Sequence, residues 1–272
     1  LFNTTEDVTT AGPVVTERNF IDRIRYSALN DPTSANAWRQ DLNAGRLDLG
    51  TRDPIIGVAL IQDRLIISCN KSTWMLVDTG NPDLPFNAQR IDNQLGVESI
   101  NSIINFDKQT IGFGTNGIHQ CNGTNVDRID GNIPDQIFQV SNTNQGPTRV
   151  AGIRDYFTEE AYWAYPDSGV TVPDSDVYPN RILVYNYKTS SWSQNDDSIT
   201  AFGSYLNPTN VTWEELMVSW EQDNDAWNDA EDQPLFSSIV AGNQEGFTFI
   251  VKNDEPRNPL GLQITTMTIA GN

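Results

Sequence analysis

Residues 54–80 read PIIGVALIQDRLIISCNKSTWMLVDTG. Three short apolar runs, rich in Ile and Val, are separated by the polar turns Gln62-Asp63 and Asn70-Lys71-Ser72. Such runs are too short and too closely interrupted for helices, and they predict three antiparallel strands joined by tight turns. A further run from Phe86 to Ile91 predicts a fourth strand. This stretch therefore predicts one up-and-down antiparallel sheet.

The same pattern recurs along the chain. Ile56, Ile103, Val150 and Ile199 each belong to an apolar run, at spacings of 47, 47 and 49 residues. A repeat of this length that contains four strands is typical of a β-propeller, in which each blade is one such sheet. We therefore expect an all-β fold, a β-propeller of four-stranded antiparallel blades. The repeat predicts about four to five blades with two loop insertions.

The repeat also predicts the organisation of the chain. Residues 1–53 are expected to hold the end of a preceding blade plus a connection. Residues 54–252 are expected to hold the blades, divided as 54–98, 99–147, 148–197 and 198–252. Within them, strands are expected to begin the 99–147 and 148–197 blades, at Ser99 to Phe106 and at Arg149 to Ile153. Residues 253–272 are expected to be an extended tail leading to a further segment, and the start at Leu1 suggests a part of something longer.

The chain is strongly acidic, with 17 basic and 36 acidic residues and a net charge of −19. This balance argues against a nucleic-acid-binding surface or an anionic membrane surface, because phosphates attract clustered Lys and Arg. No apolar run approaches the roughly 18 residues of a membrane-spanning helix. The acidity is compatible with colloidal stability, or with the negative lining of a channel through which DNA slides.

Three tryptophans, Trp213, Trp220 and Trp227, follow one another at a spacing of seven residues in an acidic segment. A helix would place them on one face. One interpretation is an aromatic stripe that docks a partner or a carbohydrate. The other is a short helix or lid that packs tryptophan onto the blades. Both remain open at this point.

Two insertions interrupt the repeat, at residues 166–180 and 206–234. The first is rich in proline and aspartate and predicts an exposed loop. Together with the three tryptophans, two residues of this loop are the candidate interaction surface: Asp174 and Asp176.

The sequence predicts no metal site and no cofactor. Asp223-Asn224-Asp225 begins like a calcium loop, but Trp227 and Asn228 stand where a ligand and a glycine are needed. One histidine and two separated cysteines, Cys69 and Cys121, leave no set of zinc ligands. The two thiols are expected to be free and partly buried.

No catalytic constellation is recognisable, so the chain is not expected to be an enzyme. His119, the only histidine, lies in a predicted strand without a nucleophile motif nearby and is expected to be structural. The adjacent carboxylate pairs cannot face one another, because neighbours on a strand point to opposite faces. These pairs are Glu159-Glu160, Asp196-Asp197 and Glu214-Glu215.

Several short motifs resemble those of the β-propeller virion proteins of tailed bacteriophages, a group that includes packaged-DNA stabilisation proteins and tail tubular nozzle proteins. The resemblance is clearest over residues 20–140. It rests on Asp53 to Gly57, Asp63 to Ser68, Ser72 to Leu76, Gly96-Val97, Ser99, Phe113-Gly114, Asn116 to Ile118 and Asn122-Gly123, with Tyr26-Ser27, Asp31-Pro32 and Trp38 upstream. Nozzle proteins are much longer than this chain.

The resemblance implies a structural ring subunit of a phage tail or neck, present in the virion and assembled in the host cytoplasm. Its partners would be neighbouring copies in a homo-oligomeric ring around the DNA channel, and tail adaptor or fibre proteins. The acidic charge and the short apolar runs predict no sequence-specific nucleic-acid binding and no membrane span. The alternatives from other classes are a glycan-binding or glycan-cleaving propeller, of receptor-binding or depolymerase type, and a general protein-interaction propeller.

Overall fold

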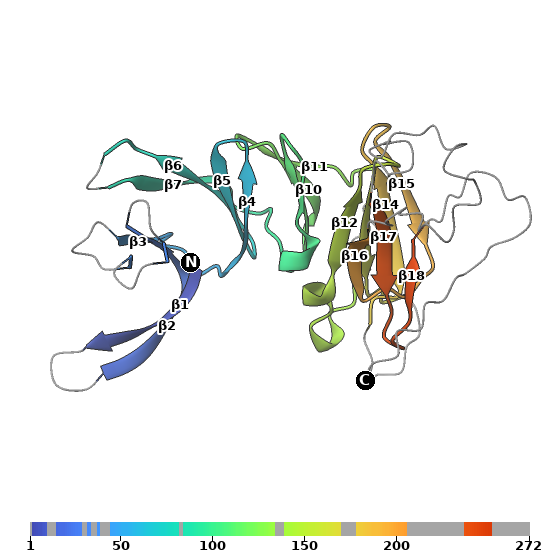
Figure 1. The fold of residues 1–272 in the computed structure, drawn as a ribbon, viewed down its shortest axis with the longest axis horizontal. Helices are drawn as coiled ribbons and strands as arrows, with labels where there is room; N and C mark the ends of the chain where they lie inside the picture. Colours follow the sequence, from blue (N-terminus) through green and yellow to red (C-terminus); the bar gives the residue numbers. More distant parts are fainter. Residues whose placement is uncertain are drawn as a thin grey trace, which may run out of the picture.

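The computed structural model describes residues 2–9, 15–28, 32–33, 37–38, 44–81, 84–133, 139–169, 178–205 and 237–251. Within these ranges the chain forms five antiparallel sheets of three or four strands (Figure 1). Two short 3-10 helices, η2 (Ile100–Ser102) and η3 (Thr143–Arg149), are the helical elements of the same ranges. The predicted all-β fold class is confirmed.

Three consecutive sheets each contain four strands in up-and-down order. The first comprises β4 (Ile55–Ile61), β5 (Arg64–Cys69), β6 (Thr73–Asp78) and β7 (Phe86–Asp92). The second comprises β8 (Ile104–Asn105), β9 (Thr110–Gly114), β10 (Gly117–Cys121) and β11 (Val126–Arg128). The third comprises β12 (Ala151–Asp155), β13 (Glu160–Tyr165), β14 (Arg181–Asn186) and β15 (Ser191–Asn195).

A three-stranded sheet lies at each end of this series. The N-terminal sheet comprises β1 (Phe2–Thr9), β2 (Val15–Tyr26) and β3 (Gly45–Asp48). The C-terminal sheet comprises β16 (Ala201–Tyr205), β17 (Ser238–Gly242) and β18 (Thr248–Ile250). The two lie at opposite ends of the molecule, so the described sheets form an open series (Figure 1).

The tight turns of the decisive stretch form as predicted. Ile61 pairs with Arg64 across the two-residue turn between β4 and β5, and Gln62 in that turn has a φ of 55°. Two-residue hairpin turns require positive φ, because only then does the turn follow the twist of its strands. The observed β5 occupies the second of the three predicted runs.

Each buried apolar cluster joins two successive sheets. Trp163 and Tyr165 of β13 pack with Phe113 and Ile111 of β9. The alternate residue of β13, Tyr162, faces the other way and packs with residues of β17. Because successive residues of a strand point to opposite faces, the β12–β15 sheet is buried on both sides. Two further clusters join β1–β3 to β4–β7, and β4–β7 to β8–β11.

The first strands of the sheets lie next to one another. Strand β4 contacts β8, β8 contacts β12, and β12 contacts β16. Each of these strands is an edge of its own sheet, so the edges gather along one side of the series. Polar bonds also join the sheets, since the indole nitrogen of Trp163 donates to the Ser102 carbonyl at 2.9 Å and that of Trp192 donates to the Ile129 carbonyl at 3.3 Å.

The predicted strand from Ser99 to Phe106 is correct only in its second half, because η2 replaces its start. The Ser102 hydroxyl donates to the Ser99 carbonyl at 2.8 Å, and the Ser99 hydroxyl donates to the Val150 carbonyl at 2.7 Å. Such side-chain bonds satisfy backbone groups that a strand would pair, so they compete with the sheet. Similarly, η3 runs to Arg149, and β12 begins only at Ala151.

Candidate functional site

The residues proposed from the sequence as an interaction surface lie outside the described part of the chain. This applies to Trp213, Trp220 and Trp227, and to Asp174 and Asp176. The insertions that carry them leave the described sheets at Gly169 and at Tyr205. Within the described part, the candidate sites are two cavities, the loop pocket and the strand cavity.

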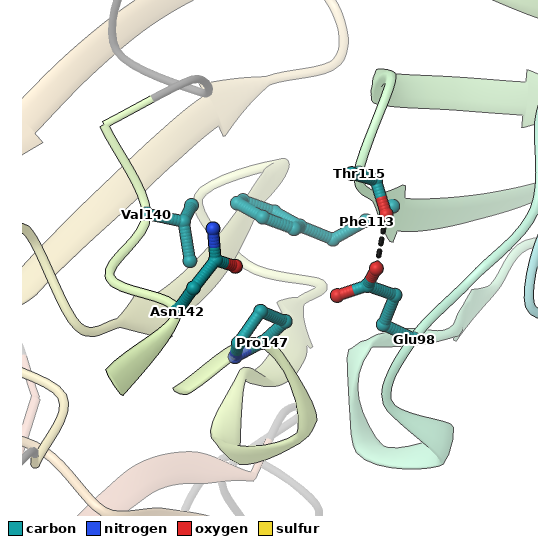
Figure 2. Close-up of a pocket in the computed structure, with 7 residues that line it drawn as sticks. Glu98, Phe113, Thr115, Val140, Asn142 and Pro147 are labelled. Carbon is teal, nitrogen blue, oxygen red and sulfur yellow. Dashed lines mark hydrogen bonds between the residues drawn. The ribbon is translucent and has the colours of Figure 1, made fainter. Parts of the chain in front are cut away.

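The loop pocket is a small cavity of about 160 Å³ between the β8–β11 and β12–β15 sheets. Phe113 forms one wall, and the Tyr165 ring lies behind it at a centroid distance of 5.9 Å. Figure 2 shows Glu98 and Thr115 on one side of the pocket, joined by a hydrogen bond from the Thr115 hydroxyl to the Glu98 carboxylate. Val140, Asn142 and Pro147, from the connection that precedes β12, line the opposite side.

The chemistry available in the loop pocket is limited. It holds one carboxylate, one amide and one hydroxyl, with neither a second carboxylate nor a histidine among its lining residues. General acid–base hydrolysis needs two groups with separate roles, which this lining does not supply. The volume is also below the roughly 300–1,000 Å³ of ordinary ligand sites.

The strand cavity is larger, about 320 Å³, and lies where β8, β12 and the paired strands β16 and β17 meet. Its apolar walls are formed by Ile103, Ile104, Ile153 and Ile239. Its polar lining residues are Asn105, Arg154, Tyr156, Ser204 and Ser237. This volume reaches the lower end of the range for small-molecule sites.

Arg154 is the charged residue of the strand cavity. Three aromatic rings surround its guanidinium, with distances from Cζ to the ring centroids of 4.4 Å for Phe106, 4.3 Å for Tyr156 and 5.0 Å for Tyr187. The sequence did not reveal this cluster of rings around Arg154. Phe106 follows β8, Tyr156 follows β12 and Tyr187 follows β14, so the three rings come together only in the folded sheets.

His119 is buried within the β8–β11 sheet, at 3% exposure. A side chain on Gly112, its partner in β9, would lie 3.2 Å from the His119 Nε2, so the imidazole uses the space that the glycine leaves free. Burial lowers the pKa of His119 to about 4, although a backbone hydrogen bond at Gly117 and the carboxylates of Asp92 and Asp130 favour its charged form. The ring is therefore neutral at pH 7, as suits a structural residue.

We expect the stability of the protein to fall between pH 6.5 and pH 4 because of His119. The unfolded chain binds a proton at this residue near pH 6.5, whereas the folded chain binds one only near pH 4. The contribution of neutral His119 to the free energy of unfolding is therefore complete above pH 6.5 and is lost as the pH falls to about 4. The loss amounts to about 3 kcal/mol. Urea denaturation of wild type and His119→Gln at pH 7 and pH 4.5 measures it, and equal pH dependence in the two proteins would contradict it.

The other candidate groups have structural roles in the described part. Cys69 and Cys121 are free and buried, and burial raises the pKa of the Cys69 thiol to about 12 and that of Cys121 in the same direction. Neither is thus a thiolate nucleophile at neutral pH. Glu159 forms an ion pair with Lys188 at 3.0 Å, and Glu160 accepts a hydrogen bond from the Tyr162 hydroxyl at 2.6 Å.

The described residues contain no group of three or more histidine, cysteine or acidic side chains placed to hold a metal ion. They also include no helix with the length and apolar character needed to cross a membrane. Among known proteins, neither a family model nor a curated sequence matches this chain.

Proposed function

We propose that this chain is a structural component of a bacteriophage tail or neck. Its sheets act as propeller blades, and copies of the chain form a ring around the DNA channel, where each copy is a rigid platform for neighbouring proteins. The observation that carries the proposal is the series of similar antiparallel sheets packed face to face, with the first strands β4, β8, β12 and β16 in contact one after another. In propellers, sheets of this type repeat radially and thereby protect their edges.

Rigidity follows from how the sheets are buried. The β12–β15 sheet contributes side chains to apolar clusters on both faces, and Trp163, at its centre, has no exposed surface. Interiors packed on both sides resist deformation, because side chains interlock and few voids remain. A platform that must transmit force along a tail needs this property.

The sequence of the two insertions suits a docking role. Residues 206–236 contain eight acidic and no basic residues, together with the three evenly spaced tryptophans. Tryptophan is enriched where protein interfaces derive most of their binding energy, and charge complementarity guides a partner into position. We assign the contacts with neighbouring copies, adaptor or fibre proteins to residues 166–180 and 206–234.

The proposal predicts that the chain is a constant part of the virus particle. Peptides from this chain should be found by quantitative mass spectrometry in purified, nuclease-treated particles, in several copies per particle and in constant ratio to the major tail proteins. The particle-free fraction of the same lysate is the control. Absence from washed particles, together with binding or cleavage of polysaccharide by the free chain, would contradict the structural role and favour the glycan alternative.

A further inference from the structure

We propose that the strand cavity binds a small hydroxylated carboxylate, of the class of the sugar acids, through the guanidinium of Arg154. This inference is independent of the position of the chain in a virus particle. It rests on the cavity volume of about 320 Å³, on the state of Arg154, and on the chemistry of the other lining residues.

Arg154 carries a charge that the described residues do not neutralise. None of the ion pairs between described residues involves it. Its Nε is buried and has no hydrogen-bond acceptor. The three aromatic rings attract the cation through their faces but accept no conventional hydrogen bond from its N–H groups.

Arg154 lines the cavity and its Nε is buried, so a ligand in the cavity is bound through the terminal Nη groups. A planar carboxylate can accept two parallel hydrogen bonds from these groups, and such forked contacts combine charge with directional specificity. The lining contains no acidic residue that would repel an anion.

The remaining lining residues match the rest of such a ligand. Asn105, Ser204 and Ser237 offer amide and hydroxyl groups, which donate to and accept from the hydroxyls of a sugar. Ile153 and Ile239 provide apolar surface for its C–H faces. Small-molecule sites commonly combine apolar walls with a few polar groups that orient the ligand.

The test uses glucuronate as the probe and the complete chain as the protein. Titration followed by NMR or calorimetry should detect saturable binding of glucuronate and no comparable binding of glucose. Arg154→Gln should weaken glucuronate binding about tenfold or more, because the forked charge-assisted contact is lost. Arg90→Gln is the matched control, since Arg90 also lies over an aromatic ring, that of Trp74 at 5.7 Å, but is exposed and lies outside the cavity. It should leave binding unchanged.

A second variant is needed, because Arg154→Gln would also lose binding if the substitution disturbed folding. Asn105 is exposed in β8, so Asn105→Asp should fold while placing a carboxylate beside the ligand, and it should also weaken binding. Unchanged binding in both folded variants would overturn the proposal. If glucose bound as tightly as glucuronate, the cavity would not recognise the carboxylate, and the proposal would be overturned. If inorganic phosphate bound as tightly, the cavity would be a general anion site instead. Preferential binding of an acidic peptide over glucuronate would reassign the cavity to a protein partner and also overturn it.

Discussion

Replacing Trp163 with alanine should lower the free energy of unfolding by about 4 kcal/mol, the largest effect that we expect from any single change. Trp163 is fully buried between the β8–β11 and β12–β15 sheets, and its ring lies 6.2 Å from that of Trp192. The substitution removes this packing and leaves the carbonyl of the buried Ser102 without its donor. Domains of this kind are stable by only about 5–15 kcal/mol, so a loss of this size is easily seen in urea denaturation.

Two further variants serve as comparisons for the loss of stability in Trp163→Ala. Trp163→Phe keeps a ring in the core but removes the hydrogen bond to Ser102, so it should cost roughly half as much. Phe157→Ala removes an aromatic ring that is 66% exposed, and it should change stability by no more than about 0.5 kcal/mol. If Trp163→Ala were as mild as Phe157→Ala, the two sheets would not pack on one another as described.

Replacing Gly96 with alanine should cost about 3 kcal/mol, although it adds only one methyl group. A Cβ at this position would lie 2.5 Å from the Lys71 backbone nitrogen and 2.6 Å from the Asn70 carbonyl carbon. These neighbours are backbone atoms held by hydrogen bonds, including that from the Val97 N–H to the Cys69 carbonyl at 2.9 Å. They cannot move aside as a flexible side chain would, so the β5–β6 turn and the segment before η2 must separate.

Gly131→Ala is the control for Gly96→Ala, because a Cβ at Gly131 meets no atom within 4 Å and the change should be nearly neutral.

Gly114 gives a further test. A Cβ there would collide with the carbonyl oxygen of Gly96, so this substitution displaces the Gly96 segment from β9, whereas Gly96→Ala displaces the same segment from the β5–β6 turn. Because the two contacts share one segment, the costs of the two substitutions should not be additive, and strict additivity would show that the contacts are independent.

The strands that could be predicted from the sequence are those with uninterrupted β-branched or aromatic runs and clear turns. Residues 54–80 are the best case, since their three apolar runs form β4, β5 and β6. Strand β1 was not predicted, because its polar residues become a strand only by pairing with β2, in a register that links Phe2 to Ile24. The first half of the strand predicted from Ser99 to Phe106 was wrong. The hydroxyls of Ser99 and Ser102 donate to backbone carbonyls there and so compete with strand pairing.

The candidate sites were harder to predict than the strands. The prediction that His119 is structural agrees with its burial, and this followed from the lack of any partner motif. Arg154 was not recognisable, because Phe106, Tyr156 and Tyr187 approach it only through sheet pairing and turn geometry. The tryptophan segment at 213–227 lies outside the described residues, so its role stays a prediction.

The central claim, that this chain is a ring-forming platform of a phage tail or neck, is tested most directly by imaging intact particles with symmetry averaging. The account predicts several symmetric copies of the chain around the channel, each with the first strands β4, β8, β12 and β16 gathered on one side of the sheet series. Particles whose tail and neck lack density for the chain, while the purified chain remains a free monomer in solution, would contradict the claim.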